Sequence, residues 1–310
     1  MTSPQFSGVI PPLLTPRTTE GELDLASLTQ LIEHLIEGGS NGIFVLGSSG
    51  EVPYLTNGER EKVLAATIET VGGRVPVLVG TNEQTTARVI DEARRLLAIG
   101  GDAIVVTSQY YALDNALEEE RHFREIAAAV DVPVFAYDVP VRTKQKLNVP
   151  LLTKLAREGV IVGVKDSSGD DISFRLLAQA TRDIEGFSLF TGHEVVCDGA
   201  MLSGAHGIVP GLGNVDPAGY KRLYDAAVAG DWNAARAEQD RLTELFNIVF
   251  VESPSVSSGA AGLGGFKTAL ELMGVIGSNT MSKPMESLGE GERERIRAIV
   301  AKAQLLEPQP

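Results

Sequence analysis

Short apolar runs alternate with helical stretches along the first three quarters of this chain, and this alternation restricts the possible folds more than any other feature. The repeat distance is roughly 25–35 residues, the size of one strand followed by one helix. Eight such units predict an α/β fold, a closed (β/α)8 TIM barrel. The eight expected strands are Gly8–Leu14, Gly42–Leu46, Val75–Gly80, Ala103–Thr107, Val132–Tyr137, Ile161–Lys165, Ser188–Thr191 and Gly207–Val209.

A doubly wound open sheet is the alternative fold for an alternating pattern. Such sheets usually have fewer strands and a glycine-rich turn after the first strand. Here the first expected strand leads into the sequence P-P-L-L-T-P, which has no glycine. We therefore expect residues 1–230 to form the barrel, which would be the catalytic part of the chain.

The last eighty residues have a different pattern, without a convincing strand. Helical stretches are expected near Trp232–Phe250, Gly265–Met273 and Glu290–Leu305. Residues 231–310 are thus predicted to be a C-terminal helical extension packed on the barrel or on a neighbouring subunit. The serine- and glycine-rich segment Ser253–Gly265 predicts a mobile connector within it.

The composition excludes several classes of partner. The 310 residues include 41 acidic and 27 basic side chains, for a net charge of −14, so nucleic acids and anionic membrane surfaces are unlikely partners. No run approaches the ~18 apolar residues of a membrane span, and the N-terminus lacks the pattern of a secretory signal. The single cysteine, Cys197, excludes an intrachain disulfide, and the four histidines lack metal-ligand spacing. We expect a cytoplasmic protein without a metal or cofactor.

The segment Val160–Gly169, V-I-V-G-V-K-D-S-S-G, carries the clearest chemical signal. A continuous apolar run indicates a buried parallel strand, and Lys165 ends it. A lysine at the carboxyl end of such a strand is partly removed from water, which disfavours its ammonium form. A neutral amine can attack a ketone and form a Schiff base. The alternative is a lysine whose ammonium simply reaches solvent.

Other polar groups also follow expected strands, where a barrel places its functional residues. The loop Gly47–Glu51 sets Ser48 and Ser49 between glycines, so its backbone can approach a ligand and its N–H groups can bind a carboxylate. It could equally be an ordinary polar loop. Tyr110 and Tyr111 follow the fourth expected strand. They could be functional, or they could be two aromatic side chains that simply pack against their neighbours.

Tyr137 and Lys165 end consecutive expected strands, which lie about 4.8 Å apart in a parallel sheet. A phenol beside a forming carbinolamine can relay protons. Arg142, a few residues beyond Tyr137, could hold an anionic group with two hydrogen bonds.

Several blocks together resemble the dihydrodipicolinate synthase / N-acetylneuraminate lyase family of class I aldolases. They are G-S-S-G-E, Y-Y, Y-D-V-P, G-V-K-D, T-G-H-E and G-A-H-G-I-V-P, in this order and over nearly the whole chain. The resemblance implies a (β/α)8 barrel, usually a homotetramer, whose lysine condenses with pyruvate or another 2-oxo acid.

The resemblance also implies roles for individual residues. Lys165 becomes the Schiff-base lysine and Tyr137 the proton relay, while Ser48 and Ser49 match the pair that binds the pyruvate carboxylate and joins the relay. Tyr111 matches an aromatic residue that crosses a tight-dimer interface, and it is counted as catalytic. Arg142, Gly192 and Val209 match substrate-binding positions.

Departures from the family pattern leave the second substrate open. Ser48-Ser49 replaces the usual pair of threonines, and Lys144 follows Thr143 where the synthases have glycine. Arg142 favours a synthase that condenses pyruvate with aspartate semialdehyde. A 2-keto-3-deoxy sugar acid aldolase comes second and a sugar-acid dehydratase third. A catalytically idle paralogue that binds 2-oxo acids is the alternative from a different class.

Overall fold

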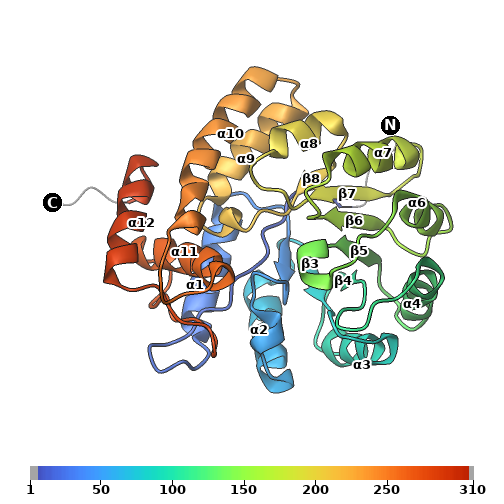
Figure 1. The fold of residues 1–310 in the computed structure, drawn as a ribbon, viewed down its shortest axis with the longest axis horizontal. Helices are drawn as coiled ribbons and strands as arrows, with labels where there is room; N and C mark the ends of the chain where they lie inside the picture. The colour runs from blue at the N-terminus through green and yellow to red at the C-terminus, as the bar shows by residue number, and fades with distance from the viewer. Residues whose placement is uncertain (1–5, 307–310) are drawn as a thin grey trace.

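The computed structural model describes residues 6–306, and eight parallel strands form its centre (Figure 1). Their hydrogen-bonded order is β1-β8-β7-β6-β5-β4-β3-β2, and a parallel bridge between Pro12 and Phe44 joins the two ends into a barrel. The (β/α)8 fold predicted from the sequence is thus confirmed. The strands are β1 (Gly8–Val9), β2 (Ile43–Val45), β3 (Val77–Gly80), β4 (Ala103–Thr107), β5 (Val134–Asp138), β6 (Gly163–Asp166), β7 (Ser188–Thr191) and β8 (Gly207–Ile208).

The first strand is much shorter than the sequence suggested. It ends at Val9, whereas the apolar run continues to Leu14. Pro11 and Pro12 have no backbone N–H and cannot donate to a neighbouring strand. The chain stays beside β2 all the same, because Leu13 N donates to Phe44 O at 2.8 Å.

A helix follows each barrel strand, and the helices surround the sheet (Figure 1). Polar residues fix where helices begin: the Thr56 and Asn115 side chains each accept from the first turn of a helix and form a capping box with Glu59 and Glu118. The helices of this part are α1 (Leu25–Glu37), α2 (Asn57–Val71), α3 (Thr86–Leu97), α4 (Ala116–Ala128), α5 (Pro140–Thr143), α6 (Val149–Arg157), α7 (Asp171–Thr181), α8 (Cys197–Ser203) and α9 (Pro217–Val228), with short 3-10 helices η1 (Val52–Tyr54) and η2 (Leu212–Asn214).

The C-terminal helices gather on one side of the barrel (Figure 1, orange to red). They are α10 (Trp232–Phe246), η3 (Asn247–Phe250), α11 (Ser258–Leu272) and α12 (Glu290–Lys302). The expected connector Ser253–Gly265 is wrong in its second half, since α11 already begins at Ser258. Gly265 is there for close packing: a Cβ at this position would lie 2.4 Å from Ile248 O.

The barrel and the C-terminal helices share one hydrophobic core. Val45 of β2 and Ile208 of β8 belong to the same buried cluster as Leu270 of α11 and Ile296 of α12. A separate cluster that includes Phe44, Tyr137 and other large side chains fills the barrel interior. The division between residues 230 and 231 stays a prediction. No helix within residues 6–306 is long and apolar enough to cross a membrane.

Candidate active site

Tyr137 and Lys165 lie side by side at the carboxyl ends of β5 and β6. The parallel pairing of β5 with β6 places these two residues opposite each other, as expected from their positions at the ends of consecutive strands. The Lys165 Nζ atom lies 4.1 Å from the centre of the Tyr137 ring and 4.7 Å from that of Phe44. Lys165 itself is only 6% exposed. The amine therefore sits in an aromatic, largely dry environment that excludes bulk water.

The phenol of Tyr137 is set up to exchange a proton. Burial raises its pKa, but the neighbouring Lys165 and hydrogen bonding with the Ser167 and Ser48 side chains outweigh burial and leave the pKa below its ordinary value of 10. A phenol of this kind gives up a proton more easily than one in water. Ser167 was not identified from the sequence, although it stands two residues after Lys165.

Gly192 follows β7 and lies against the lysine side chain. A Cβ at this position would lie 2.1 Å from Ser167 Oγ and 3.2 Å from Lys165 Cε, so any larger residue displaces one of them. Val209, which follows β8, is buried in the barrel-interior cluster that also contains Tyr137, and its N–H donates to Thr191 O at 2.8 Å. Both positions thus border the end of the barrel where Lys165 lies.

The loop Gly47–Glu51 turns sharply after β2 and brings Ser48 to Tyr137. Glu51 has a φ of +57° and Leu46, just before the loop, one of +59°, so two non-glycine residues at its ends are left-handed. Ser48 and Ser49 are both partly buried. Ser48 reaches Tyr137, whereas Ser49 forms no hydrogen bond through its side chain with the described residues.

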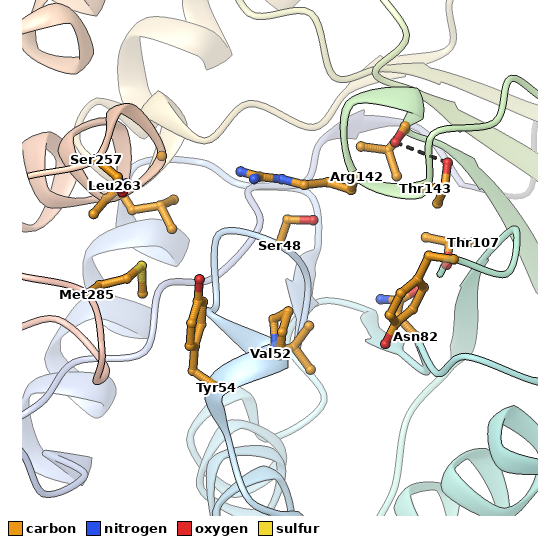
Figure 2. A pocket seen from close by; sticks show the side chains of 15 residues that line it. Ser48, Val52, Tyr54, Asn82, Thr107, Arg142, Thr143, Ser257, Leu263 and Met285 are labelled. Carbon is orange, nitrogen blue, oxygen red and sulfur yellow. Dashed lines mark hydrogen bonds between the residues drawn. The ribbon is translucent and has the colours of Figure 1, made fainter. Parts of the chain in front are cut away.

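A cavity of about 440 Å³ opens at this end of the barrel, and Figure 2 shows Arg142 extending across it above Ser48. Arg142 is exposed and has no ion pair with any residue from 6 to 306, and it is the one charged side chain of the lining. Leu263 and Met285 face it from the C-terminal segment (Figure 2). The lining consists of Ser48, Val52, Pro53, Tyr54, Asn82, Thr107, Tyr110, Val139, Arg142, Thr143, Ser257, Gly259, Ala260, Leu263 and Met285.

The short helix α5, which was not predicted from the sequence, carries Arg142. Pro140 supplies its first residue and Thr143 its last. Lys146 then anchors the loop after α5, because its ammonium contacts the buried Asp138 carboxylate and lies 3.8 Å from that of Asp166. Asp138 directly follows Tyr137, and Asp166 directly follows Lys165. The Y-D and K-D dipeptides are therefore the sequence signal that could have indicated this anchor.

Tyr111 does not enter the cavity. Its side chain is 95% exposed, and its φ is +78°. The neighbouring Tyr110 lines the cavity instead, and burial raises the pKa of its phenol. In the single chain, Tyr111 is therefore available for contact with another molecule.

Glu194 is a further ionisable group near Lys165 that was not predicted from the sequence. Burial raises the pKa of its carboxyl to about 7, against the opposing effects of Leu212, Lys165 and Gly211. Its Oε1 atom accepts from Leu212 N at 2.5 Å. Within residues 6–306, no three histidine, cysteine, aspartate or glutamate side chains are grouped so that they could hold a metal ion.

A barrel with a buried lysine and a tyrosine at adjacent strand ends defines a class I aldolase type of lyase, and this chain is an enzyme of that class. The model of the dihydrodipicolinate synthetase family matches residues 5–303. The chain belongs to this family, as the sequence blocks indicated.

Individual relatives agree with this membership. The chain is 33% identical to a 4-hydroxy-tetrahydrodipicolinate synthase of Methanoculleus marisnigri, over 95% of this chain and 98% of the relative. Among solved structures, it is similar to dihydrodipicolinate synthase from Bacteroides thetaiotaomicron, with a TM-score of 0.90, 30% identity and coverage of 97% and 100%. A prophage protein of E. coli K12 from the same family, solved in complex with pyruvate, gives a TM-score of 0.89, 28% identity and coverage of 97% and 99%.

Proposed function

We propose that the chain condenses pyruvate, or a closely related 2-oxo acid, with an aldehyde through a Schiff base at Lys165. One observation carries this proposal: the buried Lys165 Nζ atom lies over the Tyr137 ring, and Tyr137 interacts with Ser48, which lines a cavity that also contains Arg142. A buried amine next to a phenol is the pair that imine chemistry requires. The pyruvate complex of the E. coli relative supports the choice of 2-oxo acid.

The proposed reaction begins with attack of the Lys165 Nζ atom on the C2 carbonyl of the 2-oxo acid. The carbinolamine loses water and becomes an iminium ion, with Tyr137 giving the proton that the leaving hydroxyl needs. The Tyr137 phenolate then accepts a proton from C3, which gives an enamine. Its C3 atom forms the new carbon–carbon bond with the aldehyde carbonyl, and hydrolysis or displacement of the imine releases the lysine.

Ser48 extends this relay in the proposal. Its side chain contacts Tyr137 and lines the cavity, so it can pass a proton between the phenol and the substrate side. We assign the 2-oxo acid carboxylate to the Ser48–Ser49 loop, with Gly192 and Val209 forming the opposite, tightly packed border. Exposed backbone N–H groups in a glycine-flanked turn suit a carboxylate.

We also propose a role for Tyr111 in the assembly of the enzyme. An aromatic side chain that is 95% exposed on a left-handed backbone has little stabilisation in the single chain. We propose that a second copy covers Tyr111 in a homo-oligomer, a dimer or a tetramer, in which it reaches the partner's relay.

The best-supported reaction is that of a 4-hydroxy-tetrahydrodipicolinate synthase, which joins pyruvate and aspartate semialdehyde. The Arg142 guanidinium, which forms no ion pair with residues 6–306, supports it, because the semialdehyde carries a carboxylate that needs a cationic partner. The second candidate is a 2-keto-3-deoxy sugar acid aldolase. The hydroxyl groups of Thr107 and Ser257 in the cavity lining favour it, since a sugar acid presents several hydroxyls.

Steady-state assays with two substrate sets test the proposal and separate the candidates. Turnover of pyruvate with aspartate semialdehyde, and none with 2-keto-3-deoxygluconate, supports the synthase. Cleavage of 2-keto-3-deoxygluconate without synthase turnover replaces it by the aldolase. A wild-type enzyme inactive with both, and with related aldehydes, contradicts the proposed lyase.

A further inference from the structure

We propose that the buried ion pair between Glu51 and Lys267 is a positioning device, through which helix α11 holds the Ser48 loop in its catalytic geometry. The inference rests on the proposed function only in assigning Ser48 to the relay. It makes the C-terminal helices part of the active-site framework, although neither member of the pair lines the cavity.

The pair is fully enclosed and its hydrogen bonds are nearly complete. Both side chains are 0% exposed, and the Lys267 ammonium contacts Glu51 Oε1 directly. The second carboxylate oxygen, Oε2, accepts from Ser282 N at 2.8 Å, and Lys267 Nζ donates to Thr280 O at 2.8 Å. Removing two charges from water is costly, so a pair of this kind is weak evidence for stability alone. Its placement suggests another role.

On the barrel side, the pair ends the loop that carries Ser48. Glu51 lies three residues after Ser48, and its N–H donates to Ser48 O at 3.1 Å. The loop is held at a second point, because Thr15 Oγ1 donates to Gly50 O at 2.7 Å. Glu51 and Leu46 are both left-handed, a conformation that persists for such residues only where the surroundings enforce it. The buried carboxylate of Glu51 provides that enforcement.

On the other side, Lys267 belongs to a rigid helix that also forms a cavity wall. Leu263 lines the cavity and precedes Lys267 by four residues, about one helical turn. Helix α11 packs closely against η3, where a Cβ on Gly265 would lie 2.4 Å from Ile248 O. The Glu51–Lys267 pair therefore connects two walls of one cavity that are distant in the sequence.

The test compares three variants of the full-length chain. Lys267→Met leaves a buried carboxylate without its partner and can unfold the chain, so Glu51→Gln/Lys267→Met removes both charges together. Glu271→Gln is the matched control. Glu271 lies on the same helix and pairs with Arg293 at 3.1 Å, but this pair joins α11 to α12 and not to the loop.

We expect the double variant to fold, to show faster amide hydrogen exchange in residues 44–55 than the wild type, and to lose kcat roughly 10- to 100-fold, the effect of a displacement of about 1 Å. KM for pyruvate should change less than kcat. Glu271→Gln should match the wild type in both measurements. A double variant with wild-type exchange in the loop and wild-type kcat overturns the inference, as does a loss of kcat equalled by the control. Hydrogen exchange needs no substrate, so it tests whether the ion pair holds the loop even if the wild type forms no imine.

Discussion

The Nζ atom of Lys165 lies 4.1 Å from the ring centre of Tyr137, its register partner on the adjacent strand. The pairing of β5 with β6 makes the two residues neighbours, because strand neighbours are held by backbone hydrogen bonds. A relay built on two strand ends is more rigid than one built on loops, and rigidity keeps the phenol within reach of the reacting carbon.

Replacement of Tyr137 by phenylalanine tests the relay. Tyr137→Phe keeps the ring beside Lys165 but removes the hydroxyl, so we expect kcat to fall ~10²-fold or more with little change in thermal stability. Tyr224→Phe is the control, since Tyr224 lies on α9 and its hydroxyl donates to the backbone oxygen of His206 at 3.5 Å. Wild-type kcat in Tyr137→Phe would rule out the relay.

Gly192→Ala tests the close approach behind the lysine. The new Cβ would lie 2.1 Å from Ser167 Oγ and 3.2 Å from Lys165 Cε, so the Ser167 hydroxyl must leave Tyr137 or the lysine must shift. We expect kcat to fall roughly 10- to 100-fold. Gly199→Ala in α8, where a Cβ meets nothing within 4 Å, should retain full activity. Equal activities of the two variants would contradict the argument.

Arg142→Ala separates the two substrates. The guanidinium forms no ion pair with residues 6–306 and extends across the cavity, so its loss should raise KM for an acidic aldehyde about 10- to 100-fold, the size of a lost charged hydrogen bond. Imine formation with pyruvate should be nearly unchanged. Arg157→Ala, which breaks an exposed pair with Asp183, is the matched control. If Arg142→Ala instead abolished imine formation, Arg142 would belong to the pyruvate site.

Glu194 should make the stability of the enzyme depend on pH. The pKa of its carboxyl is raised from an ordinary 4.5 to about 7 by burial, so the folded chain retains a proton that the unfolded chain has lost. The protonated Glu194 carboxyl therefore contributes its full stabilisation to the folded chain below about pH 4.5, and this stabilisation is lost as the pH rises through 7. Glu194→Gln resembles the protonated form and can still accept from Leu212 N.

We therefore expect Glu194→Gln to be more stable than the wild type at pH 8, by up to about 3 kcal/mol, and equally stable near pH 4.5. Urea unfolding at both pH values measures the difference. A variant that is less stable at pH 8 would show that the carboxylate is ionised and needed there.

The main elements of the site could be predicted because they follow from strand ends. Lys165 and Tyr137 each end an apolar run, and the barrel topology then makes them neighbours. The position of Arg142 over the cavity could not be predicted in this way, since it depends on the short helix α5 and on the contact between Lys146 and Asp138.

Long-range packing explains the other differences. The ion pair between Glu51 and Lys267 joins two segments that are distant in the sequence, and no pattern in either segment predicts the contact. The glycines before Lys267 suggested mobility, whereas Gly264 and Gly265 are buried where α11 meets its neighbours. A glycine-rich segment predicts flexibility or close packing equally well until its surroundings are known.

The most direct measurement of the central claim is reductive trapping of the imine. The enzyme is incubated with pyruvate and borohydride, and the modified peptide is identified by mass spectrometry. We predict one reduced pyruvyl group per chain, on Lys165, and none in Lys165→Ala, which should still fold. Modification of Lys144, Lys146 or Lys267 in place of Lys165, or no adduct with any 2-oxo acid, would contradict the assignment.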